Sequence, residues 1–94
     1  MGPNLILNSI HAPEPVGAYP HARRIGDFLF ISGVGPRARG SSTIPGVDLD
    51  DSGNILDYDI AIQTLSVFHN IKSVLEDSGS CFEDIVDVTI FLLI

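Results

Sequence analysis

The sequence predicts an α+β fold in which one long helix packs on one face of a β-sheet. Three observations carry this prediction. The short stretches HARRI (residues 21–25) and FLFISG (residues 28–33) flank a Gly-Asp pair, which is typical of a β-hairpin. Further along, apolar residues recur with the period of an α-helix over about five to six turns. The chain then returns to a β-branched apolar run, residues 85–94, which we expect to be a strand buried on at least one face.

The hairpin is the clearest local unit of the chain. Its strands are expected over residues 21–25 and 28–33, joined by Gly26 and Asp27. A glycine at the first of two loop positions suits a type II′ turn. Both faces of the second strand are apolar, so we expect it to be central in the sheet and covered on both sides. A shorter strand is expected at residues 5–7, before a proline-rich entry segment.

The long helix follows a loop. Residues 34–54 are rich in Gly, Pro, Ser and Asp and are expected to form this loop, which is long enough to suggest a function. The helix is expected from about Tyr58, with Asp57 or Asp59 as its N-cap. Gly79 is expected to end it in the left-handed position after the C-cap.

Composition bounds the classes of protein that fit. At 94 residues the chain is one domain at most. Its 45% apolar and 18% charged residues indicate extensive buried or oligomeric surface. The net charge of −7 disfavours general nucleic-acid binding, because it repels phosphates. The single Cys81, the absence of a secretory signal and the absence of a membrane-length apolar run lead us to expect a soluble cytoplasmic protein.

Candidate binding residues gather around the hairpin. Four of the five cationic side chains lie between residues 23 and 39, namely Arg23, Arg24, Arg37 and Arg39. They are either solvated surface charges or a local positive pocket for an anionic small molecule. The strand in FLFISGVGPR (residues 28–37) ends at Ser32 and Gly33, where the missing Cβ lets a ligand approach the backbone. His21, close to Tyr19, is a candidate for proton transfer.

Two other motifs are weaker. Residues 48–59 resemble a calcium loop, but the twelfth position is Asp59 rather than a longer Glu, and no helix can precede the loop. A turn that leads into a helix explains the same residues without a metal. GVGPRA (residues 33–38) follows a strand as a dinucleotide fingerprint would, but Pro36 interrupts it and no helix opens there. The histidines show no metal-ligand spacing.

Several stretches together resemble the Rid (YjgF-like, or endoribonuclease L-PSP) family of enamine and imine deaminases. They are APEPVGAYPHARRIGDFLFISGVGP (residues 12–36), the helix pattern of Gln63, Asn70 and Leu75, and GSCFEDIVDVTIFL (residues 79–92). Within this family APEPVGAYPHARR, FISGVGPR and IPGVDLD are most similar to the 2-aminomuconate deaminase branch. Most relatives have Ser-Gln at the position of the Pro-His pair that follows the tyrosine.

The resemblance implies a chorismate-mutase-like α+β domain that forms homotrimers, with sites in the clefts between subunits. It implies hydrolytic release of ammonia from an enamine or imine acid, with no cofactor and no metal. Tyr19 and the backbone at Ser32 and Gly33 are the positions that the family uses around a ligand carboxylate. To these we add our own inferences, Arg37 and Arg39 for a second carboxylate and His21 as the proton carrier.

The chain departs from the family at its C-terminal end. Family members continue past residue 92, and an arginine that clamps the substrate and a glutamate assigned to water activation lie there. We therefore expect residues 1–94 to be a single, incomplete domain with weak deaminase activity of its own. Two alternatives remain: a non-catalytic ligand-binding or assembly module of the same fold, and an endoribonuclease, which the net charge of −7 disfavours.

Overall fold

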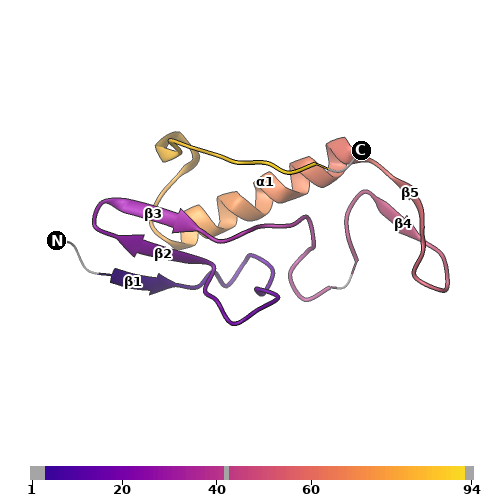
Figure 1. Ribbon diagram of the computed structural model, residues 1–94, viewed down its shortest axis with the longest axis horizontal. Helices are drawn as coiled ribbons and strands as arrows, with labels where there is room; N and C mark the ends of the chain where they lie inside the picture. Colours follow the sequence, from indigo (N-terminus) through magenta and orange to yellow (C-terminus); the bar gives the residue numbers. More distant parts are fainter. Residues whose placement is uncertain (1–3, 42, 93–94) are drawn as a thin grey trace.

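The computed structural model describes residues 4–41 and 43–92. The elements in chain order are strands β1 (Asn4–Leu7), β2 (Ala22–Ile25), β3 (Phe28–Ile31), β4 (Val47–Leu49) and β5 (Ile55–Tyr58), helix α1 (Ile60–Asp77) and the 3-10 turn η1 (Phe82–Asp84). Figure 1 shows α1 lying along the three-stranded sheet, with the β4–β5 hairpin at the far end of the molecule. The predicted α+β fold with one long helix on a sheet is confirmed.

The main sheet is antiparallel, in the order β1-β2-β3. The β2–β3 hairpin turns at Gly26, whose φ of 60° is a left-handed value that glycine adopts without strain, while Asp27 keeps a negative φ. The hairpin was therefore predicted correctly. The central position expected for β3 was wrong, because β3 is an edge strand of the described sheet.

The two faces of β3 have different surroundings. Leu29 and Ile31 are half-buried and pack against the core, whereas Phe28 and Phe30 remain 62% and 58% exposed. A strand with apolar residues on both faces can be a central strand that is covered on both sides. It can equally be an edge strand with one open face. Only the position of the strand within the sheet distinguishes them.

The core is small and lies between the sheet and the C-terminal half of α1. Ala12, Ala22 and Val74 form its buried centre, and half-buried side chains of β1 and β3 pack against it. Ala12 belongs to the proline-rich segment between β1 and β2. That segment is therefore part of the packed core and not a peripheral connection.

Helix α1 begins and ends as its local sequence requires. Asp59, rather than Asp57, is the N-cap, and its carboxylate accepts hydrogen bonds from the Ala61 and Ile62 amides. Gly79 follows the C-cap with a φ of 82°, as predicted. The helix has 18 residues. No helix in residues 4–41 and 43–92 has the length and apolar character needed to cross a membrane.

The loop predicted over residues 34–54 is partly structured, because β4 pairs with β5. In the turn between them the Asp50 carboxylate accepts hydrogen bonds from the backbone and side-chain amides of Asn54 and from the Ser52 amide. The Asn54 bonds first, and the Ser52 bond after them, lower the pKa of Asp50. The side chain that would ligate an ion thus organises its own turn.

The strand predicted over residues 85–94 was wrong in the part that the structure describes. Residues 85–92 form no strand, and in Figure 1 they run as an irregular trace antiparallel to α1. Their side chains are mostly exposed, reaching 92% at Phe91. β-Branched residues favour extended backbone, but a strand also needs a neighbouring edge to pair with. Residues 93 and 94 lie outside the described residues.

Candidate functional site

A cavity of about 200 Å³ lies where β3 ends, beneath the proline-rich segment that precedes β2. Five of the six residues predicted for the site line it: Tyr19, His21, Ser32, Gly33 and Arg37. They come from both sides of the hairpin and from the loop that follows it. These residues meet only in the folded chain, because the sheet brings the end of β3 beside the beginning of β2.

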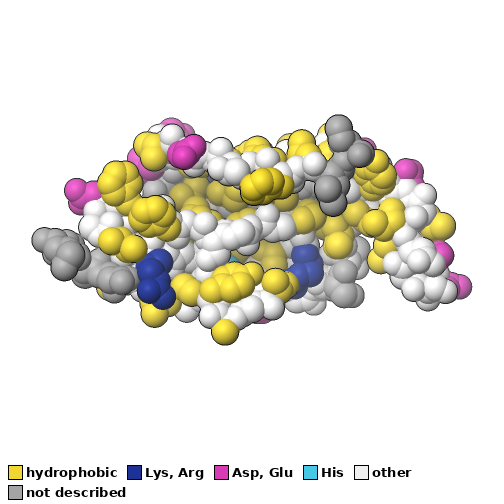
Figure 2. All heavy atoms as spheres, viewed as in Figure 1, with side chains coloured by type: hydrophobic (Ala, Val, Ile, Leu, Met, Phe, Trp, Pro, Cys, Tyr) yellow, Lys and Arg dark blue, Asp and Glu magenta, His cyan; other side chains and the backbone are white. Residues whose placement is uncertain are grey.

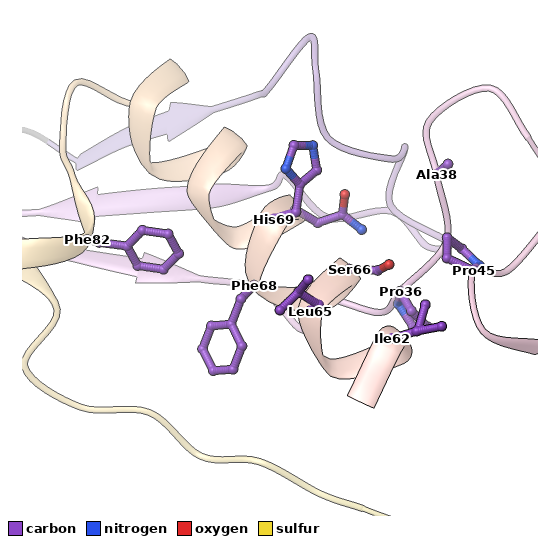
Figure 3. A pocket seen from close by; sticks show the side chains of 10 residues that line it. Pro36, Ala38, Pro45, Ile62, Leu65, Ser66, Phe68, His69 and Phe82 are labelled. Atoms are coloured by element: carbon purple, nitrogen blue, oxygen red, sulfur yellow. The ribbon is translucent and has the colours of Figure 1, made fainter. Parts of the chain in front are cut away.

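A larger and more open hollow of about 520 Å³ lies between α1 and the loop that contains Pro36 and Pro45. Figure 3 shows the side chains of Ile62, Leu65 and Phe68 along its helical wall. None of the predicted site residues lines it. Its walls are mainly apolar and contain no Arg or Lys, so they offer an acid little recognition. The smaller cavity is the candidate site.

The backbone at Ser32 and Gly33 forms one wall of the cavity. The Ser32 amide donates to the His21 carbonyl at 3.0 Å, which continues the sheet pairing, and its hydroxyl donates to the Pro20 carbonyl at 2.7 Å. A Cβ added at Gly33 would meet no atom within 4 Å. Space beside this backbone is therefore open.

Tyr19 lines the cavity from the segment before β2. Its ring packs so closely on Gly17 that a Cβ at residue 17 would lie 2.8 Å from the ring atom Cε1. A side chain there would displace the ring. Gly17 is a residue that the sequence analysis missed, and the Gly-x-Tyr spacing was the available signal.

His21 is 9% exposed and both its ring nitrogens are occupied. Nδ1 accepts a hydrogen bond from the Ser9 amide at 2.9 Å. Nε2 lies 2.6 Å from the carbonyl oxygen of Pro13, which can only accept, so Nε2 carries the proton. Through these two bonds the neutral His21 ring connects two parts of the cavity wall. Neither ring nitrogen is free to exchange a proton with a ligand.

The two predicted arginines have different places. Arg37 lines the cavity, where its guanidinium donates to the Glu14 carbonyl at 2.6 Å. Arg39 does not line it. Its guanidinium donates to the Ser9 and Ala12 carbonyls and pairs with the Glu14 carboxylate at 3.2 Å. Arg39 thus holds the segment that covers the cavity.

Two further polar residues support the site and were missed. Ser9 is buried, and its hydroxyl donates to the carboxylate of Asp77, the last residue of α1. His11 Nδ1 lies 3.0 Å from the same carboxylate. The Ser9 hydrogen bond first, and the His11 contact second, hold the pKa of Asp77 below its usual range. These contacts attach the segment over the cavity to the helix, and residue type alone gave no signal for them.

The cavity therefore offers a guanidinium, a phenol and open backbone to a small acid. Glu14 is the acidic residue that lines the cavity, and its carboxylate is paired with Arg39. The arrangement suits binding and orientation of an anion more than proton transfer.

The chain is an α+β domain with a cavity at the end of β3, and comparison with solved structures agrees on the fold. A crystal structure from Entamoeba histolytica, provisionally described as an endoribonuclease L-PSP, superposes with a TM-score of 0.61 at 29% identity. The match covers 84% of this chain and 54% of that one.

The chain belongs to the endoribonuclease L-PSP family, whose model matches residues 9–93. This confirms the family that the sequence resembles. A RutC family protein of Pyrococcus abyssi is 37% identical over 86% of this chain and 55% of its own. A protein of Dermatophagoides farinae named 2-iminobutanoate/2-iminopropanoate deaminase is 30% identical over 98% of this chain and 63% of its own. The chain thus spans less than two thirds of these relatives.

Proposed function

We propose that this chain forms the ligand cavity of a hydrolytic deaminase for small enamine or imine acids. The observation that carries the proposal is the convergence of Tyr19, Ser32, Gly33 and Arg37 on one cavity. The name of the Dermatophagoides farinae relative supports the reaction type.

In the proposed complex the substrate carboxylate binds the Arg37 guanidinium and the backbone at Gly33. An enamine first gains a proton on carbon and loses one from nitrogen, which makes it an imine. The oxygen of a water molecule then bonds to the imine carbon, and a water proton moves to nitrogen. When the carbon–nitrogen bond breaks, the hydroxyl proton leaves with the nitrogen as ammonia and a keto acid remains.

The residues of this chain bind and orient the substrate. Tyr19 packs beside the reacting carbon, and His21 acts by holding the Ser9 and Pro13 backbone in place. The proton acceptor, in this proposal, comes from the part of the family domain that the chain does not span. Without a positioned base the rate falls by about two orders of magnitude or more.

The substrate branch that we propose is 2-aminomuconate, on the strength of the sequence pattern over residues 12–24. A dicarboxylate needs a second cation. Arg39 is available only if it releases Glu14, to which it is now paired. A mono-acid such as 2-iminobutanoate needs Arg37 alone. The two substrates therefore differ in their dependence on Arg39.

We also propose a homotrimer with sites between subunits, located in the cytoplasm. The register aligns Ile6, Arg23 and Phe30 across one face of the sheet, with Ile25 beside Phe28 on the same face. The apolar members of this face are all exposed. Figure 2 shows hydrophobic side chains widely spread over one side of the molecule. Such a surface favours burial against further copies.

Ammonia release tests the proposal. The imine acid 2-iminobutanoate is generated in situ by an amino acid oxidase, which oxidises 2-aminobutanoate with O2, and 2-aminomuconate is generated fresh. Ammonia release is followed with and without the protein in each case. We expect little acceleration by the 94-residue chain and a large one by a family-length protein that contains it. No acceleration by the longer protein would refute deaminase function. Ligand binding without turnover would favour the non-catalytic module, and a salt-sensitive RNA gel shift would favour the ribonuclease alternative.

A further inference from the structure

Asn70 is a buried polar residue in the middle of α1. Its side chain lies on the side of the helix that faces the loop after β3, and the residue is 5% exposed. An asparagine is neither a strong helix former nor an apolar core residue. A buried amide costs free energy unless its hydrogen-bonding groups are satisfied, so its partners show what it does.

Those partners are backbone carbonyls of the loop after β3. The Asn70 Nδ2 group donates to the Gly35 carbonyl and to the Arg37 carbonyl, both at 2.9 Å. An amide NH₂ has two hydrogens, and both are used here. The two carbonyls lie on either side of Pro36, so one side chain closes this turn.

The loop has little else to hold its backbone. Among the described residues, no backbone–backbone hydrogen bond involves residues 33–37. Gly33, Gly35 and Arg37 nevertheless all line the cavity. The Asn70 amide is therefore the direct connection between the helix and the loop that carries the cationic side chain of the site.

We propose that Asn70 is a positioning residue, which sets the place and direction of Arg37 for the carboxylate of a bound acid. This inference rests on the proposed function for the identity of the ligand. A freely moving loop would present Arg37 in many directions, and binding would then pay the cost of ordering it. Asn70 removes that cost before the ligand arrives.

A double-mutant cycle tests the inference with pyruvate, the stable keto acid that hydrolysis of 2-iminopropanoate leaves. Pyruvate affinity is measured for the unaltered chain, Asn70→Ala, Arg37→Ala and the double variant. We expect each single change to weaken binding about tenfold. The double variant should bind like Arg37→Ala, because Asn70 acts through Arg37. Additive losses, or no loss in Asn70→Ala, would overturn the inference.

Two controls separate positioning from a general loss of stability. His69→Ala removes the neighbouring side chain, which is exposed and lines the other hollow, and should leave pyruvate binding unchanged. Asn70→Asp keeps the size but removes both donors, so it should weaken binding at least as much as Asn70→Ala. A melting curve of each variant reports stability separately from affinity.

A measurement without ligand keeps the inference independent of the proposed function. The ¹⁵N relaxation of the Arg37 Nε–H group reports the order of its guanidinium. We expect lower order in Asn70→Ala and unchanged order in His69→Ala. If the unaltered chain binds no pyruvate, the ligand assignment fails, and Arg37 order alone then decides: unchanged order in Asn70→Ala would overturn the positioning role.

Discussion

The hydroxyl of Ser9 donates a hydrogen bond to the carboxylate of Asp77, which lies 68 positions further along the chain. This bond joins the segment over the cavity to the C-terminal end of α1. Asp77 is unfavourably placed with respect to the helix dipole, and no basic residue lies in the last turn. Hydrogen-bond donors from Ser9 and His11 offset this unfavourable interaction of the Asp77 carboxylate.

The pH dependence of stability follows from this contact. Because the folded state lowers the pKa of Asp77 below 3.8, the unfolded chain takes up its proton first as the pH falls. The contribution of the Asp77 contacts to the free energy of unfolding is present above about pH 4. It is lost as the pH falls through the folded-state pKa of Asp77. We expect Asp77→Asn to melt at a lower temperature at pH 7 and to show a weaker acid dependence. Glu76→Gln, on the same turn, is the control. Equal melting curves for Asp77→Asn and the unaltered chain would contradict this role.

Gly33→Val tests the open wall of the cavity. The added side chain would occupy the space beside the backbone without meeting another atom, so the fold should survive. Pyruvate binding should fall at least about tenfold, since the valine fills the place of the carboxylate. Affinity by calorimetry and a circular dichroism spectrum report the two effects. Ala38→Val, which lines the other hollow, serves as the control. A folded Gly33→Val chain with full affinity would place the ligand elsewhere.

His21→Ala tests whether this residue supports the cavity wall or carries protons. It removes two hydrogen bonds from a buried side chain, and we expect a loss of about 2–4 kcal/mol of unfolding free energy. Urea unfolding measures this, with the exposed His69→Ala as the control. In a family-length protein, the supporting role predicts that His21→Ala leaves the shape of the pH–rate profile unchanged. A rate limb that disappears with His21 would establish proton transfer instead.

Phe30→Asp tests the open face of the sheet. If copies of the chain associate through this face, a buried carboxylate among Ile6, Ile25 and Phe28 should prevent association. Light scattering should show a homo-oligomer, a trimer in our proposal, for the unaltered chain and a monomer for the variant. Leu65→Asp is the control, because Leu65 is also exposed but lies on α1. A monomeric unaltered chain at micromolar concentration would contradict the assembly.

Candidate site residues could be proposed from sequence, but not the contacts that they make. Gly33 and Arg37 were proposed because an open backbone and a cation are properties of residue type. The hydrogen bonds of His21 could not be predicted, since the partners of its two nitrogens, Ser9 and Pro13, are visible only in the folded chain. Asn70 was seen as part of a helix pattern, while its bonds to the loop were not.

The sequence by itself determined the elements whose causes are local. Gly26 allows the hairpin turn, and Asp59 and Gly79 set the ends of α1, because turns and caps depend on residues within a few positions. The tertiary structure alone decided which apolar segments are paired and covered. It placed β3 at the edge of the sheet and, among the described residues, left 85–92 without a partner strand. Pairing and burial depend on neighbours distant in sequence, and β-propensity contains no information about them.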